Sequence, residues 1–182
     1  MLTVRPARSA EAGALARIGL FAWEVAIASW GEDVERLRAN ATAAYTDFCN
    51  RCWPDIVVAE WDGAMAGWGA SENADDEITD LWVLPTFQGR GIGTRLIGEL
   101  ETAIRARGHQ QARLGTHARN LGAIRLCKEL GYHVSAYMVA YAPSLDTDID
   151  KVEMVKSFAA DGDGGPEGDA DRLPGDGLYG DV

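Results

Sequence analysis

Residues 81–94 read Leu81-Trp82-Val83-Leu84-Pro85-Thr86-Phe87-Gln88-Gly89-Arg90-Gly91-Ile92-Gly93-Thr94. The pattern indicates an apolar strand, a turn that begins at Pro85, a loop with three alternating glycines, and then a helix. The start of such a helix presents several unpaired backbone N–H groups together with the positive end of the helix dipole. Glycines also let the backbone approach a ligand where a Cβ would obstruct it. The sequence therefore predicts a phosphate-binding loop.

An ordinary tight turn is the alternative interpretation, and two common phosphate-binding folds are disfavoured. A P-loop requires Gly-Lys-Ser/Thr, whereas Gly93 is followed by Thr94-Arg95. A dinucleotide-binding fold requires an acidic residue at the end of the next strand, and residues 113–117 end without one. Three alternating glycines between a strand and an amphipathic helix favour phosphate binding over a tight turn.

Strands and helices are intermixed on both sides of this loop, with no internal repeat. Apolar runs and turn residues predict seven strands, at residues 2–5, 56–60, 65–71, 77–83, 113–117, 134–141 and 151–158. Helical spacing predicts four helices, which begin near Ser9, near Asp33, at Ile92 and at Asn120. This order predicts an α/β (α+β) fold with one mixed sheet, in a single domain at residues 1–160.

The composition of the chain changes after Ala160. In residues 161–182, 15 of 22 residues are Gly, Asp or Pro, so we expect an acidic, disordered tail. The formal net charge of the 182 residues is -11, which disfavours a nucleic-acid partner held through its phosphates.

No apolar run approaches the roughly 18 to 20 residues of a membrane-spanning helix, and the N-terminus lacks an apolar signal-peptide core. We therefore expect a cytoplasmic protein with no membrane partner. The three cysteines are an odd number for a disulfide framework, so free thiols are expected. Cys49 and Cys52 have no second pair or suitably spaced histidines beside them, so no metal site is predicted.

The sequence resembles the GNAT superfamily of N-acetyltransferases in several separate motifs. Gln88-Gly89-Arg90-Gly91-Ile92-Gly93 fits the family's acetyl-coenzyme A loop, Gln/Arg-x-x-Gly-x-Gly/Ala, at every specified position. Leu81-x-Val83-x-Pro85 is similar to the family's fourth strand and its exit. Asn120-x-x-Ala123-x-x-Leu126, followed by Gly131-Tyr132, is similar to its Asn-x-x-Ala helix, and residues 151–156 resemble its last strand. The resemblance covers residues 2–160.

This resemblance implies a GNAT-like three-layer α/β/α fold, with one mixed and mostly antiparallel central sheet of about seven strands and four helices. It implies acetyl-CoA as cosubstrate, and transfer of its acetyl group to a primary amine of a small molecule, peptide or protein by direct attack in a ternary complex. The pyrophosphate would sit on the amides of residues 88–93, with the pantetheine arm along the preceding strand. The cofactor-binding residues implied are Leu81, Trp82, Val83, Gln88, Gly89, Arg90, Gly91, Ile92, Gly93, Thr94 and Asn120.

Acetyl transfer to an amine requires a base, because an amine with a pKa near ~10.4 arrives protonated. By the resemblance, Glu77 occupies the base position, and Thr79 is a candidate to hold a water. Alternation along residues 77–83 would put both on one face with Leu81 and Val83. A solvated strand start beside two other acidic residues is the alternative role for Glu77, and Asp80 is the reserve base.

Stabilisation of the oxyanion would come from a backbone N–H near Val83 or Leu84. The family often carries a Tyr, as the acid that reprotonates the thiolate, at the position that Cys127 occupies here. Cys127 is therefore a candidate acid, with a buried core thiol as the alternative. This departure keeps a second function open, a catalytically silent acyl-CoA-binding regulatory module.

The acceptor is not specified by these motifs. Trp23, Trp30 and Trp53 fall on or near the helices that wall the acceptor pocket in this family, which favours an arylalkylamine or another hydrophobic amine. The oligomeric state also stays open, and a homodimer is among the expectations.

Overall fold

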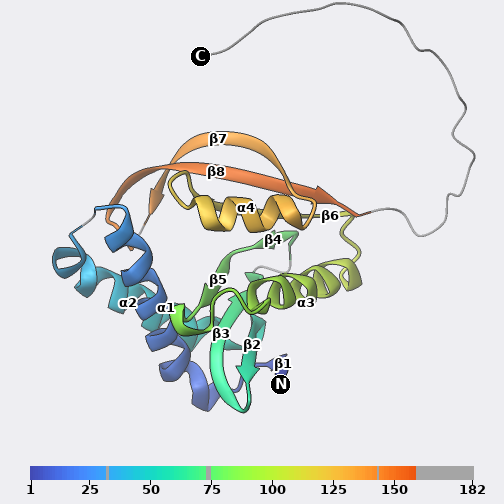
Figure 1. Ribbon diagram of the computed structural model, residues 1–182, viewed down its shortest axis with the longest axis horizontal. Helices are drawn as coiled ribbons and strands as arrows, with labels where there is room; N and C mark the ends of the chain where they lie inside the picture. The colour runs from blue at the N-terminus through green and yellow to red at the C-terminus, as the bar shows by residue number, and fades with distance from the viewer. Residues whose placement is uncertain (32, 73–74, 143, 159–182) are drawn as a thin grey trace, which may run out of the picture.

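The computed structural model describes residues 1–31, 33–72, 75–142 and 144–158 (Figure 1). The described residues form four α-helices: α1 (Ala12–Ser29), α2 (Val34–Cys52), α3 (Ile92–Ala106) and α4 (Leu121–Glu129). They also form eight strands: β1 (Leu2–Pro6), β2 (Ile56–Trp61), β3 (Ala64–Ala70), β4 (Glu77–Ile78), β5 (Asp80–Val83), β6 (Gln111–His117), β7 (His133–Ala142) and β8 (Thr147–Ser157). The predicted α/β (α+β) class is confirmed. The predicted tail, residues 161–182, and the domain boundary at residue 160 lie outside the described residues.

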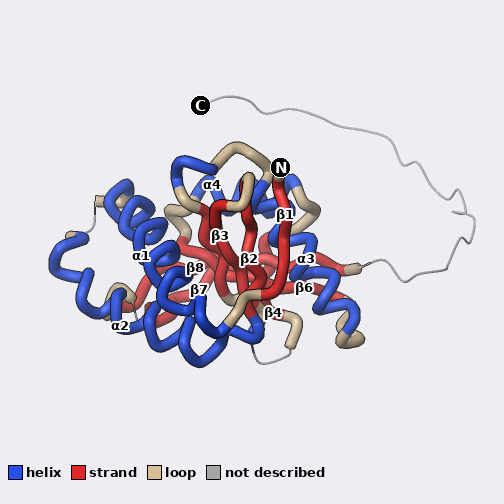
Figure 2. The backbone as a smooth tube through the Cα atoms, turned by 90° about the horizontal axis from the view of Figure 1, so that it is seen from below, coloured by secondary structure: helices blue, strands red, loops and turns tan. Residues whose placement is uncertain are grey.

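Helices cover both faces of the strands, and Figure 2 shows α1 and α2 on one side and α3 on the other. α1 and α2 pack on the face of β2 and β3 that carries Val58 and Trp68. α3 packs on the opposite face, where Ile92 and Leu96 meet Ala59 and Ala66. α3 and α4 also cover the sheet that contains β6 and β8. The result is a three-layer arrangement.

Hydrogen bonds divide the strands into two four-stranded sheets, in the orders β1-β2-β3-β5 and β4-β6-β8-β7. All pairs are antiparallel except β4 with β6, which is parallel. The strands are thus mixed and mostly antiparallel as predicted, but they number eight in two hydrogen-bonded sheets rather than about seven in one. The additional strand arises because the segment 77–83, expected as one strand, is two.

Thr79 is the point at which this segment changes partner. Before it, Glu77 and Ile78 pair with β6, and after it, residues 80–83 pair with β3. The Thr79 N–H and Oγ1 both donate to the carbonyl of Ala70, at 2.9 and 3.3 Å. The two halves of the segment therefore belong to different sheets, which diverge from this residue.

The alternation predicted along residues 77–83 is wrong across this break. Ile78 packs in the same cluster as Leu81, against α3 and α4. Trp82 instead packs with α1 and α2, and its ring makes an edge contact with Tyr45 at 5.4 Å between centroids. Since neighbours within a strand point to opposite faces, Glu77 does not share a face with Leu81. The change of partner at Thr79 is the physical reason.

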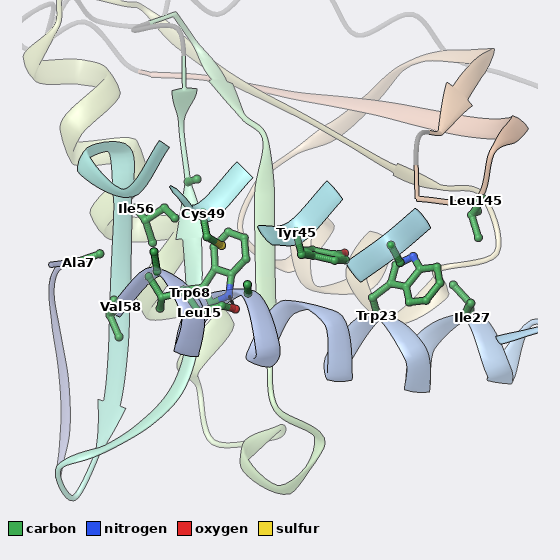
Figure 3. Packing of buried hydrophobic residues seen from close by; sticks show 14 of the residues in the cluster. Ala7, Leu15, Trp23, Ile27, Tyr45, Cys49, Ile56, Val58, Trp68 and Leu145 are labelled. Atoms are coloured by element: carbon green, nitrogen blue, oxygen red, sulfur yellow. Dashed lines mark hydrogen bonds between the residues drawn. The ribbon is translucent and has the colours of Figure 1, made fainter. Parts of the chain in front are cut away.

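Trp68 is the centre of the core beneath α1 and α2 (Figure 3). Its indole is fully buried, and Nε1 donates to the carbonyl of Leu15 at 2.8 Å. The ring of Phe48 stacks on it at 5.8 Å between centroids. Gly19 leaves the space for this packing, because a Cβ there would lie 2.9 Å from the rings of Trp68 and Tyr45. The first helix is thereby fixed on the sheet.

The expectation that no segment is long and apolar enough to cross a membrane is wrong by length and composition. Residues 9–29 are helical, with a mean hydropathy of 1.3. The alanines of this segment raise its mean hydropathy even though charged residues interrupt the apolar run. Leu15, Trp23 and Ile27 are nevertheless buried in the core of the protein. The buried side of this helix therefore packs in the way that a core helix of a folded domain does.

Gly67 tests the join between β3 and β5. A Cβ on Gly67 would lie 2.4 Å from the Trp82 carbonyl oxygen and 3.0 Å from Val83 Cα, both of which are backbone atoms. We expect Gly67→Ala to lower the free energy of unfolding by more than about 2 kcal/mol, because backbone must shift. Gly98→Ala is the control, since nothing lies within 4 Å of its Cβ position inside α3. It should stabilise the protein by about 0.5 to 1 kcal/mol. Urea denaturation of both variants tests this, and equal stability would contradict it.

Candidate active site

Two adjoining cavities lie where β5 and β6 diverge. The larger is about 490 Å³ and the smaller about 220 Å³. Leu81 and Trp82 line both cavities from β5, Asn120 and Ala123 line both from the side of α4, and Ala26 of α1 closes the junction. A ligand that fills the larger cavity can therefore reach a ligand in the smaller one at these residues.

The larger cavity is walled by the glycine-rich loop. Gly89 and Gly91 have φ angles of +72° and +77°, a conformation that favours glycine. Gly91 is the N-cap of α3, so the first N–H groups of the helix have no acceptor within it. All of the expected cofactor-binding residues except Arg90 line this cavity. They are Leu81, Trp82, Val83, Gln88, Gly89, Gly91, Ile92, Gly93, Thr94 and Asn120. These amides and the helix dipole together suit an anionic group.

Arg90 is the expected cofactor-binding residue that does not line the cavity. Its guanidinium lies over the rings of Trp61 and Phe87, 5.2 and 5.5 Å from their centroids. Cation–π attraction to these two rings accounts for the absence of Arg90 from the cavity wall. Its neighbour Arg95, at the start of α3, pairs with Glu99 on the same helix at 2.8 Å.

The edge of β5 offers main-chain groups to the cleft. The Leu84 N–H donates to the Ala66 carbonyl at 2.9 Å, and Val83 lies opposite Gly67. In an antiparallel pair the bonded positions alternate, so the main-chain groups of Val83 and Leu81 face away from β3. Consistent with this, the Val83 carbonyl accepts from Gln88 Nε2 at 3.2 Å. Of the two backbone donors expected for the oxyanion, Leu84 is therefore engaged and Val83 faces the cleft.

Asp80 is the carboxylate of the smaller cavity. Its Oδ1 accepts from Trp82 Nε1 at 2.9 Å. Burial raises the pKa of Asp80 to about 6; the hydrogen bonds from Trp82 and Thr79 oppose this rise and the nearby charge of Glu72 adds to it. A carboxyl with this pKa is ionised at neutral pH and accepts a proton more readily than an ordinary aspartate.

Glu77, the expected base, lines neither cavity. It lies on β4, with its carboxylate 3.9 Å from Lys151 Nζ, opposite Arg113 of β6. The break at Thr79 puts it on the charged face of the second sheet. The structure thus brings Asp80, the reserve base, to the cavity and leaves Glu77 outside it. Spacing alone could not separate the two, because the break has no marker in the sequence.

Cys127 lines the smaller cavity from α4. Its side chain is buried, and burial raises the pKa of the thiol to about 11. The thiol is therefore neutral at physiological pH. All three cysteines, Cys49, Cys52 and Cys127, are free and buried.

Asn120 caps α4 at the junction of the two cavities. Its Oδ1 accepts from the Ala123 N–H at 3.2 Å, and its Nδ2 donates to Thr116 Oγ1 at 3.1 Å. These two bonds tie the start of α4 to the end of β6. Ala26, Thr116 and Ser144 also line the smaller cavity and are not among the residues predicted from the sequence. For Ala26, the small side chains on the cavity side of α1 were a signal that could have found it.

A family model described as Acetyltransferase (GNAT) family matches residues 20–132. Because the match spans more than half of the chain, this chain belongs to the GNAT family of acetyltransferases. The predicted family and fold are confirmed. Solved structures of this fold hold coenzyme A or acetyl-CoA, which is consistent with the predicted cosubstrate.

The chain is also similar to individual relatives of known sequence or structure. An uncharacterized N-acetyltransferase of Methanocaldococcus jannaschii is 41% identical over 56 residues, which is 31% of this chain and only 25% of that protein. The L-amino acid N-acyltransferase MnaT of Escherichia coli is 24% identical over 144 residues, 75% of this chain and 83% of that protein. The crystal structure of the PaiA N-acetyltransferase of Thermoplasma acidophilum, in complex with coenzyme A, superposes with a TM-score of 0.72. It is 18% identical and covers 87% of this chain and 99% of that one.

The raised pKa of Asp80 predicts a pH-dependent stability. An aspartate has a pKa near ~3.9 when unfolded, so as pH rises from about 4 to about 6 the unfolded state loses its proton first and folding stability falls. Asp80→Asn removes this cost. We expect the variant to be more stable than the parent by roughly 1 to 3 kcal/mol at pH 8, with the difference shrinking towards pH 4. Urea denaturation at both pH values measures it; a variant less stable at pH 8 would contradict the burial argument.

Proposed function

We propose that the protein transfers the acetyl group of acetyl-CoA to a primary amine by direct attack in a ternary complex. The observation that carries this proposal is the meeting of the two cavities at Leu81, Trp82, Asn120 and Ala123. One cavity has a loop suited to phosphate, and the other has a carboxylate with a raised pKa. The thioester and the amine would meet at the junction.

Acetyl-CoA would dock by two backbone features. Its pyrophosphate would accept hydrogen bonds from the amides of residues 88–94, at the start of α3. Its pantetheine arm, which contains amides, would pair with the groups of Leu81 and Val83 that face away from β3. This extends the edge of β5 as an added strand would. The thioester carbonyl would then lie near the Val83 N–H, which would stabilise the oxyanion.

The chemistry begins with the removal of a proton from the acceptor. The Asp80 carboxylate would take a proton from the ammonium group, and the neutral nitrogen would attack the thioester carbon. A C–N bond forms, the carbonyl oxygen becomes negative, and collapse of the intermediate breaks the C–S bond. The nitrogen then gives its remaining extra proton to the departing thiolate. The products are the N-acetyl amide and coenzyme A, with Asp80 protonated until it releases its proton to solvent.

Cys127 is a poor donor for that last step. With a pKa of about 11 it holds its proton more tightly than an ordinary thiol, whose pKa is near ~8.5. Proton transfer from Cys127 to the coenzyme A thiolate would therefore run uphill. We assign Cys127 to the wall of the cavity and the proton to the attacking nitrogen.

The proposed acceptor is a primary amine of a small molecule, peptide or protein. The E. coli relative is named for L-amino acids, but its identity of 24% is too low to carry an acceptor over to this chain. A cytoplasmic location and a homodimer also stay predictions.

Asp80 and Glu77 can be separated by their effect on rate. We expect Asp80→Asn to lower kcat by about 100-fold or more, because a general base typically contributes 10²- to 10⁴-fold. In the parent, kcat/KM should rise about tenfold per pH unit up to the Asp80 pKa of about 6 and flatten above it. The Asn variant should lose this rise.

Glu77→Gln is the matched control, because it also replaces a carboxylate by an amide and lies outside both cavities. It should keep its kcat within about threefold of the parent. Thiol release from acetyl-CoA measures all three proteins. A loss in Glu77→Gln equal to that in Asp80→Asn would return the base to Glu77. Cofactor binding without thiol release from any amine would favour the silent acyl-CoA-binding module.

The glycine loop predicts a separate effect on cofactor affinity. Alanine at position 89 or 91 must adopt a left-handed conformation, which costs about 1 to 2 kcal/mol per residue. An alanine loop that relaxes out of this conformation in the free protein must return to it to bind the pyrophosphate, so Gly89→Ala and Gly91→Ala should each weaken binding of coenzyme A by about 5- to 30-fold. Calorimetric titration measures this, with Gly98→Ala as a control away from the loop. Unchanged affinity in both loop variants would remove the loop from the site.

A further inference from the structure

We infer that the acceptor is a small primary amine with an aromatic or bulky apolar group and without a carboxylate. This inference rests on the proposed function, because it concerns the cavity that would hold the acceptor. It follows from three properties of that cavity: the side chains of its wall, its charge and its size.

Aromatic and aliphatic side chains make most of the wall. Trp23 lines it from α1, Trp30 lines it from the C-cap of that helix, and Trp82 lines it from β5. Leu145 and Ile149 line it from the hairpin of β7 and β8. Burial of an apolar group against such a wall is favourable by about 25 cal/mol per Å². An acceptor with no apolar group would leave this surface unused.

The aromatic end of the cavity is held in place before any ligand binds. The ring of Trp30 lies on the ring of His117, with 4.7 Å between their centroids. The Trp30 carbonyl accepts from Arg119 Nη1 at 3.1 Å, and His117 Nδ1 accepts from the Arg119 N–H at 3.0 Å. These contacts join the end of α1 to the end of β6. A wall fixed in this way loses little freedom when a ring packs against it.

The charged side chains of the cavity suit a ligand that carries a single cationic group. Among the described residues that line it, Asp80 and His117 are the only acidic or basic side chains, and there is no lysine or arginine. An ammonium group would pair with Asp80, and the faces of the neighbouring tryptophans also attract cations. A carboxylate in the same space would meet the like charge of Asp80, with no lysine or arginine among the described lining residues to pair with it, which is costly. A second ammonium on a longer chain would lie against the apolar wall without a counter-ion.

The size of the cavity points in the same direction. Its volume of about 220 Å³ is below the ~300 to 1,000 Å³ of pockets that hold drug-sized ligands. An amine with one ring suits this space, whereas a large polycation such as an aminoglycoside does not. The cavity therefore selects for a compact molecule with its charge at one end.

Three commercially available amines test this class with the full chain and acetyl-CoA. They are 2-phenylethylamine, L-phenylalanine, which adds a carboxylate to the same skeleton, and putrescine, which has two ammonium groups and no ring. Thiol release gives kcat/KM for each. We expect 2-phenylethylamine to exceed both of the others by at least tenfold. Equal or better turnover of L-phenylalanine or putrescine overturns the inference and leaves the proposed acetyltransferase activity standing.

A variant pair ties the preference to the wall. Trp30→Ala should raise KM for 2-phenylethylamine about tenfold with a smaller change in kcat, and should lower the ratio of its kcat/KM to that of ethylamine. Trp53→Ala is the matched control, because Trp53 lines neither cavity. An unchanged ratio in Trp30→Ala overturns the inference. If calorimetry shows acetyl-CoA bound and none of these amines releases thiol, the inference fails. The proposed function fails as well only if a wider panel of amines, amino acids and peptides also releases no thiol.

Discussion

The segment from Glu77 to Val83 cannot satisfy its backbone hydrogen bonds within one sheet. Its first half pairs with β6, its second half pairs with β3, and Thr79 bridges the change through the Ala70 carbonyl. Beyond that residue, β5 and the end of β6 diverge and do not pair. The edge of β5 then keeps main-chain groups that no strand takes up, and such groups require a partner. In this protein the partner expected is the amide-bearing arm of the cosubstrate.

The rest of the site is arranged around this opening. Gln88 binds the Val83 carbonyl, so the glycine-rich loop is fixed to the end of the strand whose edge it extends. Asn120 fixes α4 to β6 on the other side. Asp80 lies on the same short strand as Val83, so one element positions both the proposed base and the proposed oxyanion donor. The desolvation that raises the pKa of Asp80 costs stability when the carboxylate is ionised, and the same raised pKa suits the proposed role as a base.

Much of the fold can be predicted from the sequence, because the glycine-rich loop, the helices and most of the strands have local sequence signals. The glycines at 89, 91 and 93, the stripe of α3 and the cap at Asn120 each act within a few residues. The break at Thr79 was not readable, since it depends on which distant strand each half meets. The resemblance puts Glu77 at the base position with Asp80 in reserve, and no local signal in the sequence reverses that order. Arg90 was expected at the phosphates for its charge, but Trp61, distant in sequence, holds it elsewhere.

The most direct test of the account is a crystal structure of the protein with acetyl-CoA bound. We predict that the pantetheine arm lies between β5 and β6, that the Val83 N–H is within hydrogen-bond distance of the thioester carbonyl oxygen, and that the pyrophosphate sits on the amides of residues 88–94. A nucleotide bound outside this cleft, or β5 and β6 paired directly with each other in the complex, would contradict the account.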